Sequence, residues 1–339
     1  MAQGTRVVRL TELAERNQAR NEGTRVGGAN RSRSFISAQN LFNRHQRLMY
    51  QRLVAHTELG VLVFAFNART GFSGDLWLRG TTGLRSGTIG RHSSVDLFLD
   101  SDDGFSLRQS VVLVRSVLGV PLIRVVDLDS STGFSIGDQA ELHAVDADGA
   151  FCMRAGDYVF FVSPTGAPPP WNPGLEDPWS MLPQAVVATR PRRVAEPRAP
   201  APPRERGSPS GQTNVSRLRG PTTAGESALV EPGETVAGVL HLTADEGSEH
   251  LEVGGAALDR GVMVGRYSRC GGGAWASNNV SRVHALVIRV DGAVWIVDTG
   301  STNGTWIDGV EAKCAQLGPG VLARLSQDES LTVRWQPAG

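Results

Sequence analysis

The sequence has few cysteines and no spacing that would make them structural. Cys152, Cys270 and Cys314 are odd in number and lie far apart, so neither a disulfide framework nor a metal-ligand motif is present. Disulfide-poor chains are typical of reducing compartments. We therefore expect a cytoplasmic protein with no bound metal or other cofactor.

Long apolar runs are also missing. The first residues, MAQGTRVVRL, contain no apolar core of signal-peptide length. The most apolar stretch, SVVLVRSVLGVPLIRVV, is interrupted by Arg115 and Arg124 and falls short of a membrane span. The sequence thus predicts neither export nor a membrane partner.

Net charge is absent too, because 34 basic residues balance 34 acidic ones. All basic residues except Lys313 are arginines. The balance argues against a chain that binds nucleic acid through its overall charge. Charge is nevertheless uneven, since residues 1–56 hold ten Arg and three Glu. The patterns VVRLTELAERNQAR and LFNRHQRLMYQRLV in this segment predict a basic N-terminal arm that is partly helical and otherwise disordered.

Proline and arginine dominate residues 164–235, which include RPRRVAEPRAPAPPRERGSPSG and few apolar residues. Proline lacks a backbone donor and favours extended conformations. We expect this segment to be a solvated, disordered linker.

The two remaining blocks, 57–163 and 236–337, repeat one pattern. Each opens on Gly-Val-Leu, beginning at Gly60 and at Gly238. Each later presents an apolar strand that ends in Asp and a small-polar turn, VVDLDSSTG in the first block and IVDTGSTNG in the second. The repetition indicates an internal duplication.

The spacing of the repeat is also shared. Each block contains a Gly-Arg turn, ending at Arg91 and at Arg266. Fourteen residues separate each arginine from a serine, Ser106 or Ser281, and an apolar strand follows. Short β-branched strands between Gly, Asp, Asn and Ser turns, with almost no helical periodicity, predict a two-sheet β-sandwich for each block.

The turn DTGSTNGTW carries more hydrogen-bonding side chains than a hairpin requires. The pair Asn303-Gly304 alone suits a two-residue turn. The hydroxyls of Ser301, Thr302 and Thr305 need another explanation, and we interpret them as phosphate ligands.

The second block resembles the forkhead-associated (FHA) domain over about 100 residues. Three motifs carry the resemblance in the family's order: GR ending at Arg266, SRxH beginning at Ser281, and STNGT beginning at Ser301. The resemblance implies an eleven-stranded β-sandwich whose loops at one end bind phosphothreonine peptides. The expected fold class is therefore all-β, with two FHA-like β-sandwiches joined by the Pro-rich linker.

The resemblance also implies roles for individual residues. Arg266 and Ser281 would contact the phosphate, with Arg282 beside it and Thr302 adding a hydroxyl. Asn303 would hold the peptide backbone, because a carboxamide both donates and accepts. Arginine suits the phosphate, since its planar fork matches two oxygens at once.

Four further positions follow from the same resemblance. Asn279 would read the ligand residue three after the phosphothreonine. Gly265, His284 and Gly304 would be structural, with His284 supporting the binding loops.

The first block keeps the Gly-Arg turn but departs at the ligand positions. Leu107 and Gln109 stand where the second block has Arg and His, and Thr132 replaces its Asn. We expect an FHA-like fold with phosphate binding lost or weak, used as a structural or protein-docking module. Four acidic residues near the same loops would also repel a dianion: Asp100, Asp102, Asp103 and Asp129.

These observations predict a non-catalytic adaptor in Ser/Thr kinase signalling, with a phosphothreonine protein, a kinase or its substrate as partner. No nucleophile–base pair or nucleotide loop indicates an enzyme. The alternative is a scaffold that docks proteins without phosphate, with residues 1–56 contacting nucleic acid, although no nucleic-acid-binding motif is present. Self-capture is a further hypothesis, for which four threonines of the arm and linker are candidates: Thr5, Thr24, Thr189 and Thr213.

Overall fold

The computed structural model describes residues 6–8, 36–100, 105–130, 133–137, 139–188, 212–222, 229–273, 276–328 and 331–339. The chain divides into two compact units. The first comprises Met1–Gly83, Val114–Arg124 and Thr132–Leu218. The second comprises Leu84–Leu113, Val125–Ser131 and Arg219–Gly339, so it contains both the C-terminal block and part of the first one.

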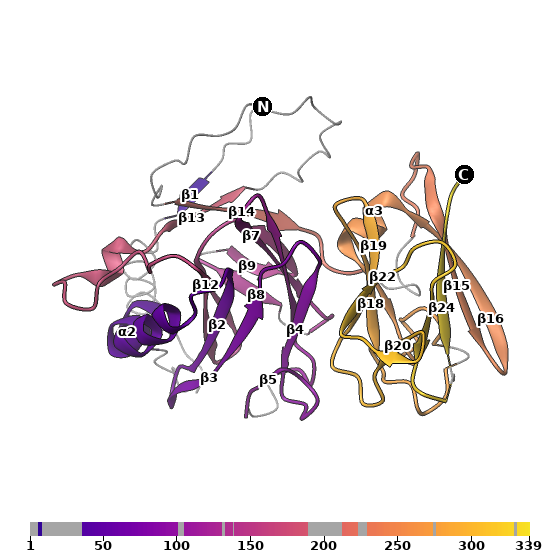
Figure 1. Ribbon diagram of the computed structural model, residues 1–339, viewed down its shortest axis with the longest axis horizontal. Coiled ribbons are helices and arrows are strands. Elements are labelled where there is room, and N and C mark those ends of the chain that lie inside the picture. Colours follow the sequence, from indigo (N-terminus) through magenta and orange to yellow (C-terminus); the bar gives the residue numbers. More distant parts are fainter. Residues whose placement is uncertain are drawn as a thin grey trace, which may run out of the picture. The chain divides into compact units, whose positions relative to one another are not determined.

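The first block is a β-sandwich of two sheets (Figure 1). Its six-stranded sheet has the order β3-β2-β12-β11-β8-β9. The strands β10-β7-β6-β4-β5 form the other sheet, which is extended beyond β10 by three strands from other parts of the chain. The described residues give the block these strands: β2 (Gly60–Asn67), β3 (Gly71–Arg79), β4 (Arg85–Gly90), β5 (Leu97–Phe98), β6 (Ser110–Val117), β7 (Val120–Asp127), β8 (Phe134–Ile136), β9 (Gln139–Leu142), β10 (Ala144–Ala147), β11 (Phe151–Ala155) and β12 (Tyr158–Thr165).

The second block repeats this strand order. Its sheets run β16-β15-β24-β23-β20-β21 and β17-β18-β19-β22, which correspond position by position to β3-β2-β12-β11-β8-β9 and β4-β6-β7-β10. The shared topology agrees with the duplication read from the sequence, and the all-β prediction is confirmed. The described strands of this block are β15 (Val236–Ala244), β16 (Gly247–Gly254), β17 (Val262–Val264), β18 (Ala285–Val290), β19 (Ala293–Asp298), β20 (Thr305–Ile307), β21 (Val310–Glu311), β22 (Cys314–Gln316), β23 (Leu322–Leu325) and β24 (Thr332–Pro337), with the short helix α3 (Gly255–Arg260) between β16 and β17.

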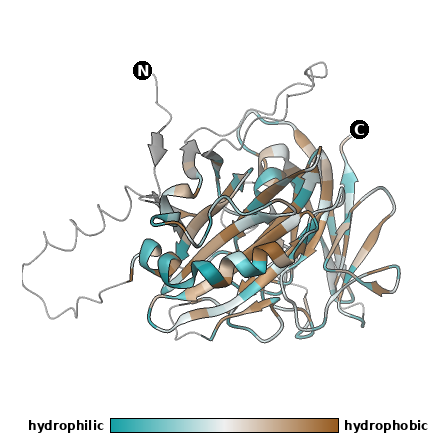
Figure 2. Ribbon diagram, turned by 60° about the vertical axis from the view of Figure 1, so that its left-hand side comes forward, coloured by the Kyte–Doolittle hydropathy of each residue, from teal (hydrophilic) through white to brown (hydrophobic). Residues whose placement is uncertain are grey.

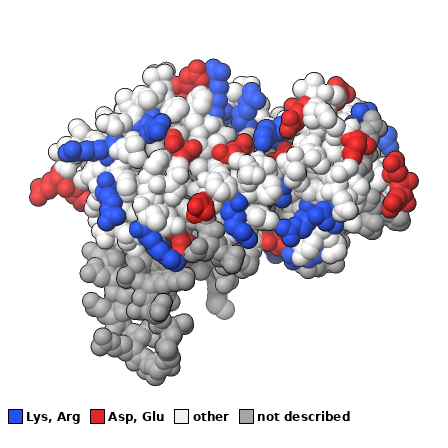
Figure 3. All heavy atoms as spheres, turned by 90° about the horizontal axis from the view of Figure 1, so that it is seen from below, with Lys and Arg blue, Asp and Glu red and all other residues white. Residues whose placement is uncertain are grey.

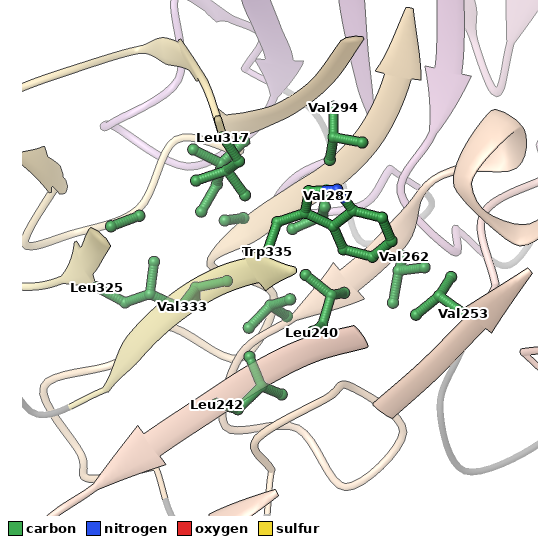
Figure 4. Close-up of a cluster of buried hydrophobic side chains, with 14 of the residues drawn as sticks. Leu240, Leu242, Val253, Val262, Val287, Val294, Leu317, Leu325, Val333 and Trp335 are labelled. Atoms are coloured by element: carbon green, nitrogen blue, oxygen red, sulfur yellow. The ribbon is translucent and has the colours of Figure 1, made fainter. Parts of the chain in front are cut away.

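The core of the second block lies between its two sheets. Leu240 and Trp335 come from the six-stranded sheet and pack with Val262 and Val287 of the four-stranded sheet (Figure 4). On β24 the buried Trp335 is next to the exposed Arg334, the alternation that a strand with one buried face requires. The apolar residues at every second position therefore fix the register of each strand.

The glycine that opens each block lies under a tryptophan. A Cβ atom at Gly238 would come 2.4 Å from both the Trp335 ring and the Gln336 carbonyl, and one at Gly60 would come 2.5 Å from the Leu78 carbonyl and 2.9 Å from the Trp77 indole nitrogen. These distances are too short for any side chain. The glycine of the repeated Gly-Val-Leu thus reflects close approach of a neighbouring strand's backbone and an indole to the first strand of each sandwich.

Helix α2 (Ala38–Ala55) covers the six-stranded sheet of the first block. The hydroxyl of Ser37 caps it by accepting the Asn40 N–H at 3.1 Å. Its buried face includes Phe42, whose ring lies 5.3 Å from both Trp171 and Trp179. In Figure 2 the helix, which lies in front, mixes hydrophilic and hydrophobic residues as an amphipathic surface helix does.

The predicted linker is partly ordered, which corrects the expectation for those stretches. The 3-10 helix η1 (Pro178–Met181), β13 (Gln184–Ala188) and β14 (Gln212–Leu218) all lie within residues 164–235. β14 pairs antiparallel with β10, and β13 pairs parallel with β14. Two buried tryptophans of the segment join the α2 cluster, so isolated aromatic residues outweigh the surrounding prolines here. Residues 189–211 lie outside the described residues.

The N-terminal arm departs from its prediction in a similar way. The helix predicted within LFNRHQRLMYQRLV is present as α2, but it packs on the first block. The stretch β1 (Arg6–Val8), for which the pattern predicted helix, pairs as a strand with β13, as its two valines favour. Residues 9–35 lie outside the described residues, and the nucleic-acid alternative stays a prediction.

Candidate functional site

Three segments of the C-terminal block meet at the predicted site: the loop after β17, the segment before β18 and the turn between β19 and β20. The N–H of Arg266 donates to the carbonyl of Ser281 at 3.1 Å. The N–H of Tyr267 donates to the carbonyl of Arg282 at 3.0 Å. From the third segment, the N–H of Thr302 donates to the Ser281 hydroxyl at 3.1 Å. Hydrogen bonds therefore hold the three predicted motifs against one another.

Gly265 is required by this close approach. A Cβ atom at this position would lie 2.8 Å from the Ser281 carbonyl oxygen and 2.9 Å from the His284 backbone nitrogen. Because backbone atoms cannot move aside as a side chain can, any larger residue would separate the first segment from the second.

His284 joins the second segment to the third. Its ring is fully buried, and Nδ1 accepts the Ser281 N–H at 3.1 Å. Nε2 lies 3.0 Å from the Gly304 carbonyl. Since Nδ1 must accept and a carbonyl cannot donate, Nε2 carries the proton. Burial is the main cause that lowers the pKa of His284. The charge of Asp298 and the hydrogen bond to Gly304 raise this pKa, and the charge of Arg108 lowers it further.

The lowered pKa of His284 makes the site sensitive to acid. The ring is neutral above the unfolded pKa of about 6.5, so its contribution to stability is fully present there and is lost as pH falls through the folded pKa. The thermal midpoint of the unmodified protein is expected to fall between about pH 7.5 and about pH 5.5. We expect a smaller fall for His284→Gln. Thermal unfolding at both pH values measures this fall. An equal fall in the unmodified protein and in the variant would contradict the prediction.

The first block contains the precedent for that substitution. Gln109 occupies the position of His284, and its Oε1 accepts the Ser106 N–H at 3.1 Å. Its Nε2 donates to the Ser130 hydroxyl at 2.6 Å and to Asp127 at 3.2 Å. A carboxamide thus makes the same kind of loop-to-turn connection as the imidazole, but it does not titrate.

Asp298 organises the turn between β19 and β20 from inside. Its carboxylate is buried and accepts the N–H groups of Gly300 and Ser301, each at 2.8 Å. It also accepts the hydroxyls of Ser301 at 2.5 Å and Thr305 at 2.8 Å. The interpretation of the Ser301 and Thr305 hydroxyls as phosphate ligands is therefore wrong, because both serve an internal carboxylate. The sequence signal that we missed is the Asp that precedes these small polar residues, which is typical of an Asx turn.

The Ser281 hydroxyl is arranged as a donor. Its oxygen accepts the Thr302 N–H at 3.1 Å and an Arg108 N–H at 3.3 Å. Two bound donors leave the hydroxyl hydrogen for an acceptor from outside. Arg266, Arg282 and Thr302, on the segments that meet at Ser281, are exposed. The arrangement therefore offers guanidinium donors and hydroxyl donors together to a dianion.

Asn303 and Asn279 bind each other across the rim. The Asn303 side chain donates to the Asn279 carbonyl at 2.7 Å, and the Asn303 carbonyl accepts the Trp306 indole N–H at 2.9 Å. The Asn303 side-chain oxygen has no partner among the described residues, so it is available to a peptide N–H. The Asn279 side chain donates to Asp328, and its role in reading the ligand stays a prediction.

The arginine of the Gly-Arg turn in the first block is half-buried and bonded to its own backbone. Nε of Arg91 donates to the Phe105 carbonyl at 2.6 Å, whereas Arg266 has no such bond among the described residues. That bond uses one of the five guanidinium N–H groups, and the expected loss of phosphate binding in this block stays a prediction. The Thr132 position and the acidic residues Asp102 and Asp103 lie outside the described residues.

The described residues carry few other candidates. On the face in Figure 3, acidic and basic side chains are interspersed, in keeping with their equal numbers. Within the part of the chain that the structure describes, no group of three or more His, Cys, Asp or Glu could hold a metal ion. No helix among these residues is long and apolar enough to cross a bilayer.

Comparisons with known proteins identify the C-terminal motifs. The FHA domain model matches residues 262–325, which contain all three motifs. None of the curated proteins matches the chain. Among solved structures, the Rv1747 FHA-1 domain of Mycobacterium tuberculosis is 18% identical with a TM-score of 0.25, over 30% of this chain and 99% of that one. The FHA domain of the CT664 protein of Chlamydia trachomatis is 16% identical with a TM-score of 0.25, over 31% of this chain and 96% of that one. Mycobacterium tuberculosis EmbR, solved in complex with a low-affinity phosphopeptide, is 17% identical with a TM-score of 0.25, over 37% of this chain and 31% of that one.

Proposed function

We propose that this chain, which carries an FHA domain at residues 262–325, is a non-catalytic adaptor that binds phosphothreonine peptides through that domain. One observation carries the proposal. The Ser281 hydroxyl accepts two donors, so its hydrogen is left for an outside acceptor, and the exposed Arg266, Arg282 and Thr302 lie on the segments that are bonded to one another at Ser281. This is a set of donors without an acceptor of its own, as a site for an anion requires.

The chemistry of the set fits a phosphorylated peptide better than a free anion. A phosphothreonine brings almost two negative charges and three acceptor oxygens. Beside the charged donors, the Asn303 carboxamide has an available oxygen that can accept a peptide N–H. Because the three loops are bonded to one another, little ordering is required on binding. We expect affinities on the order of micromolar.

The partner class follows from the ligand. We infer that the chain joins a phosphothreonine-containing protein to others, with a Ser/Thr kinase or a kinase substrate as that protein. The first block would then be a structural or docking module without phosphate binding, since Leu107, Gln109 and Thr132 replace the Arg, His and Asn of the second block.

Self-capture through Thr213 is disfavoured by the structure. Thr213 is buried, and its hydroxyl donates to the Ala150 carbonyl at 2.6 Å. A kinase could not reach it without opening the β14 pairing. The other three candidates, Thr5, Thr24 and Thr189, lie outside the described residues.

The test uses the full chain and an oriented peptide library. Phosphothreonine is fixed in the library and the flanking positions are degenerate, with phosphoserine and unmodified threonine libraries as controls. We expect binding of the phosphothreonine library alone, or at least about tenfold more strongly than of the others. Equal retention of the phosphorylated and unmodified libraries would overturn the proposal.

A further inference from the structure

An arginine of the first block reaches the phosphate site. Arg108 lies in the segment Leu84–Leu113, which belongs to the same compact unit as the C-terminal block. Its Nε donates to the Gly300 carbonyl at 2.8 Å, and its Nη2 donates to the Ser281 hydroxyl at 3.3 Å. Arg108 thus touches both the serine of the second motif and the turn that carries the third.

Neighbouring contacts within this unit hold the same region together. The Ser94 hydroxyl donates to the Gly300 carbonyl at 2.5 Å. Gly300 has φ of +78°, and a Cβ atom there would lie 3.0 Å from Val95. An ion pair at 3.5 Å joins Lys313 to Asp96. Arg108 is therefore one member of a packed contact and does not reach the site as an isolated surface side chain.

Arg108 donates to neutral oxygens only, among the residues that the structure describes. Burial is the main cause that lowers the pKa of Arg108. The charge of Asp298 raises this pKa, and the charge of Arg282 lowers it further. Burial likewise lowers the pKa of His92, with Arg108 and Arg282 adding to it. His92, Arg108 and Arg282 are thus close enough to affect one another electrostatically, and Arg108 carries this positive charge to Ser281, where a bound anion would offset the repulsion.

Arg108 leaves the site open. Arg266, Arg282, Thr302 and Asn303 are all exposed in the full chain, so the arginine does not cover them. A guanidinium has five N–H donors, and the two bonds above use two of them. Donors remain for an oxygen bound at the Ser281 hydroxyl.

We infer that Arg108 completes the phosphate site, so that the first block supplies a guanidinium to the phosphothreonine bound by the second. The inference rests on the proposed function. It assigns the first block, which departs from the second at the ligand positions, a part in the site of its neighbour. Ligand binding would then depend on both blocks.

The test is peptide binding by full-length variants. With a phosphothreonine peptide selected from the library, we expect Arg108→Ala to lose about tenfold or more in affinity, and Arg108→Lys to lose less because it keeps the charge without the fork. Arg79→Ala is the matched control in the first block, since the exposed Arg79 pairs with Glu58. Combining Arg108→Ala with Arg266→Ala should lose less than the sum of the two, because both act on one phosphate.

A second measurement separates binding from packing. Without Arg108, the Gly300 carbonyl keeps the Ser94 donor and the Ser281 hydroxyl keeps the Thr302 donor, so no group is orphaned. We therefore expect no fall in thermal midpoint for Arg108→Ala without peptide. A parallel fall in stability and affinity would overturn the inference by assigning a structural role.

Other outcomes also decide the question. Unchanged binding by Arg108→Ala, while Arg266→Ala is inactive, would overturn the composite site and leave the proposed function standing. Tighter binding by Arg108→Ala would overturn it too, by showing that Arg108 blocks the site. Failure of the unmodified full chain to bind any phosphothreonine peptide would overturn the proposed function and this inference together.

Discussion

Replacing Arg266 with alanine is expected to lower the affinity of the full chain for a phosphothreonine peptide by about ten- to a hundredfold. The side chain is exposed and its backbone N–H is bonded to the Ser281 carbonyl, so under the proposed function it would meet a phosphate bound at Ser281. A charge-assisted bond from guanidinium to phosphate is worth about 1.5–3 kcal/mol. Fluorescence anisotropy with a labelled peptide measures the loss.

The control for Arg266 is another arginine of the same block. Arg334 is exposed on β24 and alternates with the buried Val333 and Trp335. We expect Arg334→Ala to bind as the unmodified protein does, which separates loss of a ligand contact from loss of positive charge. Equal affinities for Arg266→Ala and Arg334→Ala would show that the Gly-Arg turn does not bind the phosphate.

Replacing Asp298 with alanine is expected to have the largest effect on stability, about 3–5 kcal/mol. The buried carboxylate satisfies two backbone N–H groups and two hydroxyls, from Gly300, Ser301 and Thr305. Alanine would leave all four buried donors without their acceptor, and the turn that carries Asn303 would lose its shape. Urea unfolding measures the stability, and the peptide assay is expected to show lost binding.

Matched substitutions make the Asp298 result specific. Asp127 plays the corresponding part in the first block, where it accepts the N–H and hydroxyl of Ser130 at 3.0 and 2.5 Å. We expect Asp127→Ala to destabilise that block similarly, whereas Asp245→Ala, in an exposed hairpin turn, should change little. A stable, fully binding Asp298→Ala variant would show that the hydroxyl network is dispensable.

Much of the fold was predictable because it depends on short-range patterns. The alternation of apolar and polar residues on strands such as β24 specifies which face is buried. Glycines at Gly265 and Gly304 mark backbone positions that exclude a side chain or adopt positive φ. The helix around Phe42 was also predictable, but its docking on the first block was not, since its tryptophan partners lie in a segment that reads as a proline-rich linker.

The roles of the hydroxyls could not be predicted from the turn itself. Ser301, Thr302 and Thr305 look equivalent in sequence, yet two of them point to the buried Asp298 and one is exposed. Which hydroxyl faces inward depends on the path of the turn around a carboxylate. Composition alone does not specify that path.

The sequence by itself determined the two repeated blocks, their sheet type and the order of the three FHA motifs, because each depends on residues close together in the chain. Only the tertiary structure decided that Arg91 bonds to its own backbone while Arg266 is exposed, and that Arg108 reaches Ser281 from 173 positions away. Contacts of that kind arise from how packed elements meet, and no local pattern encodes them.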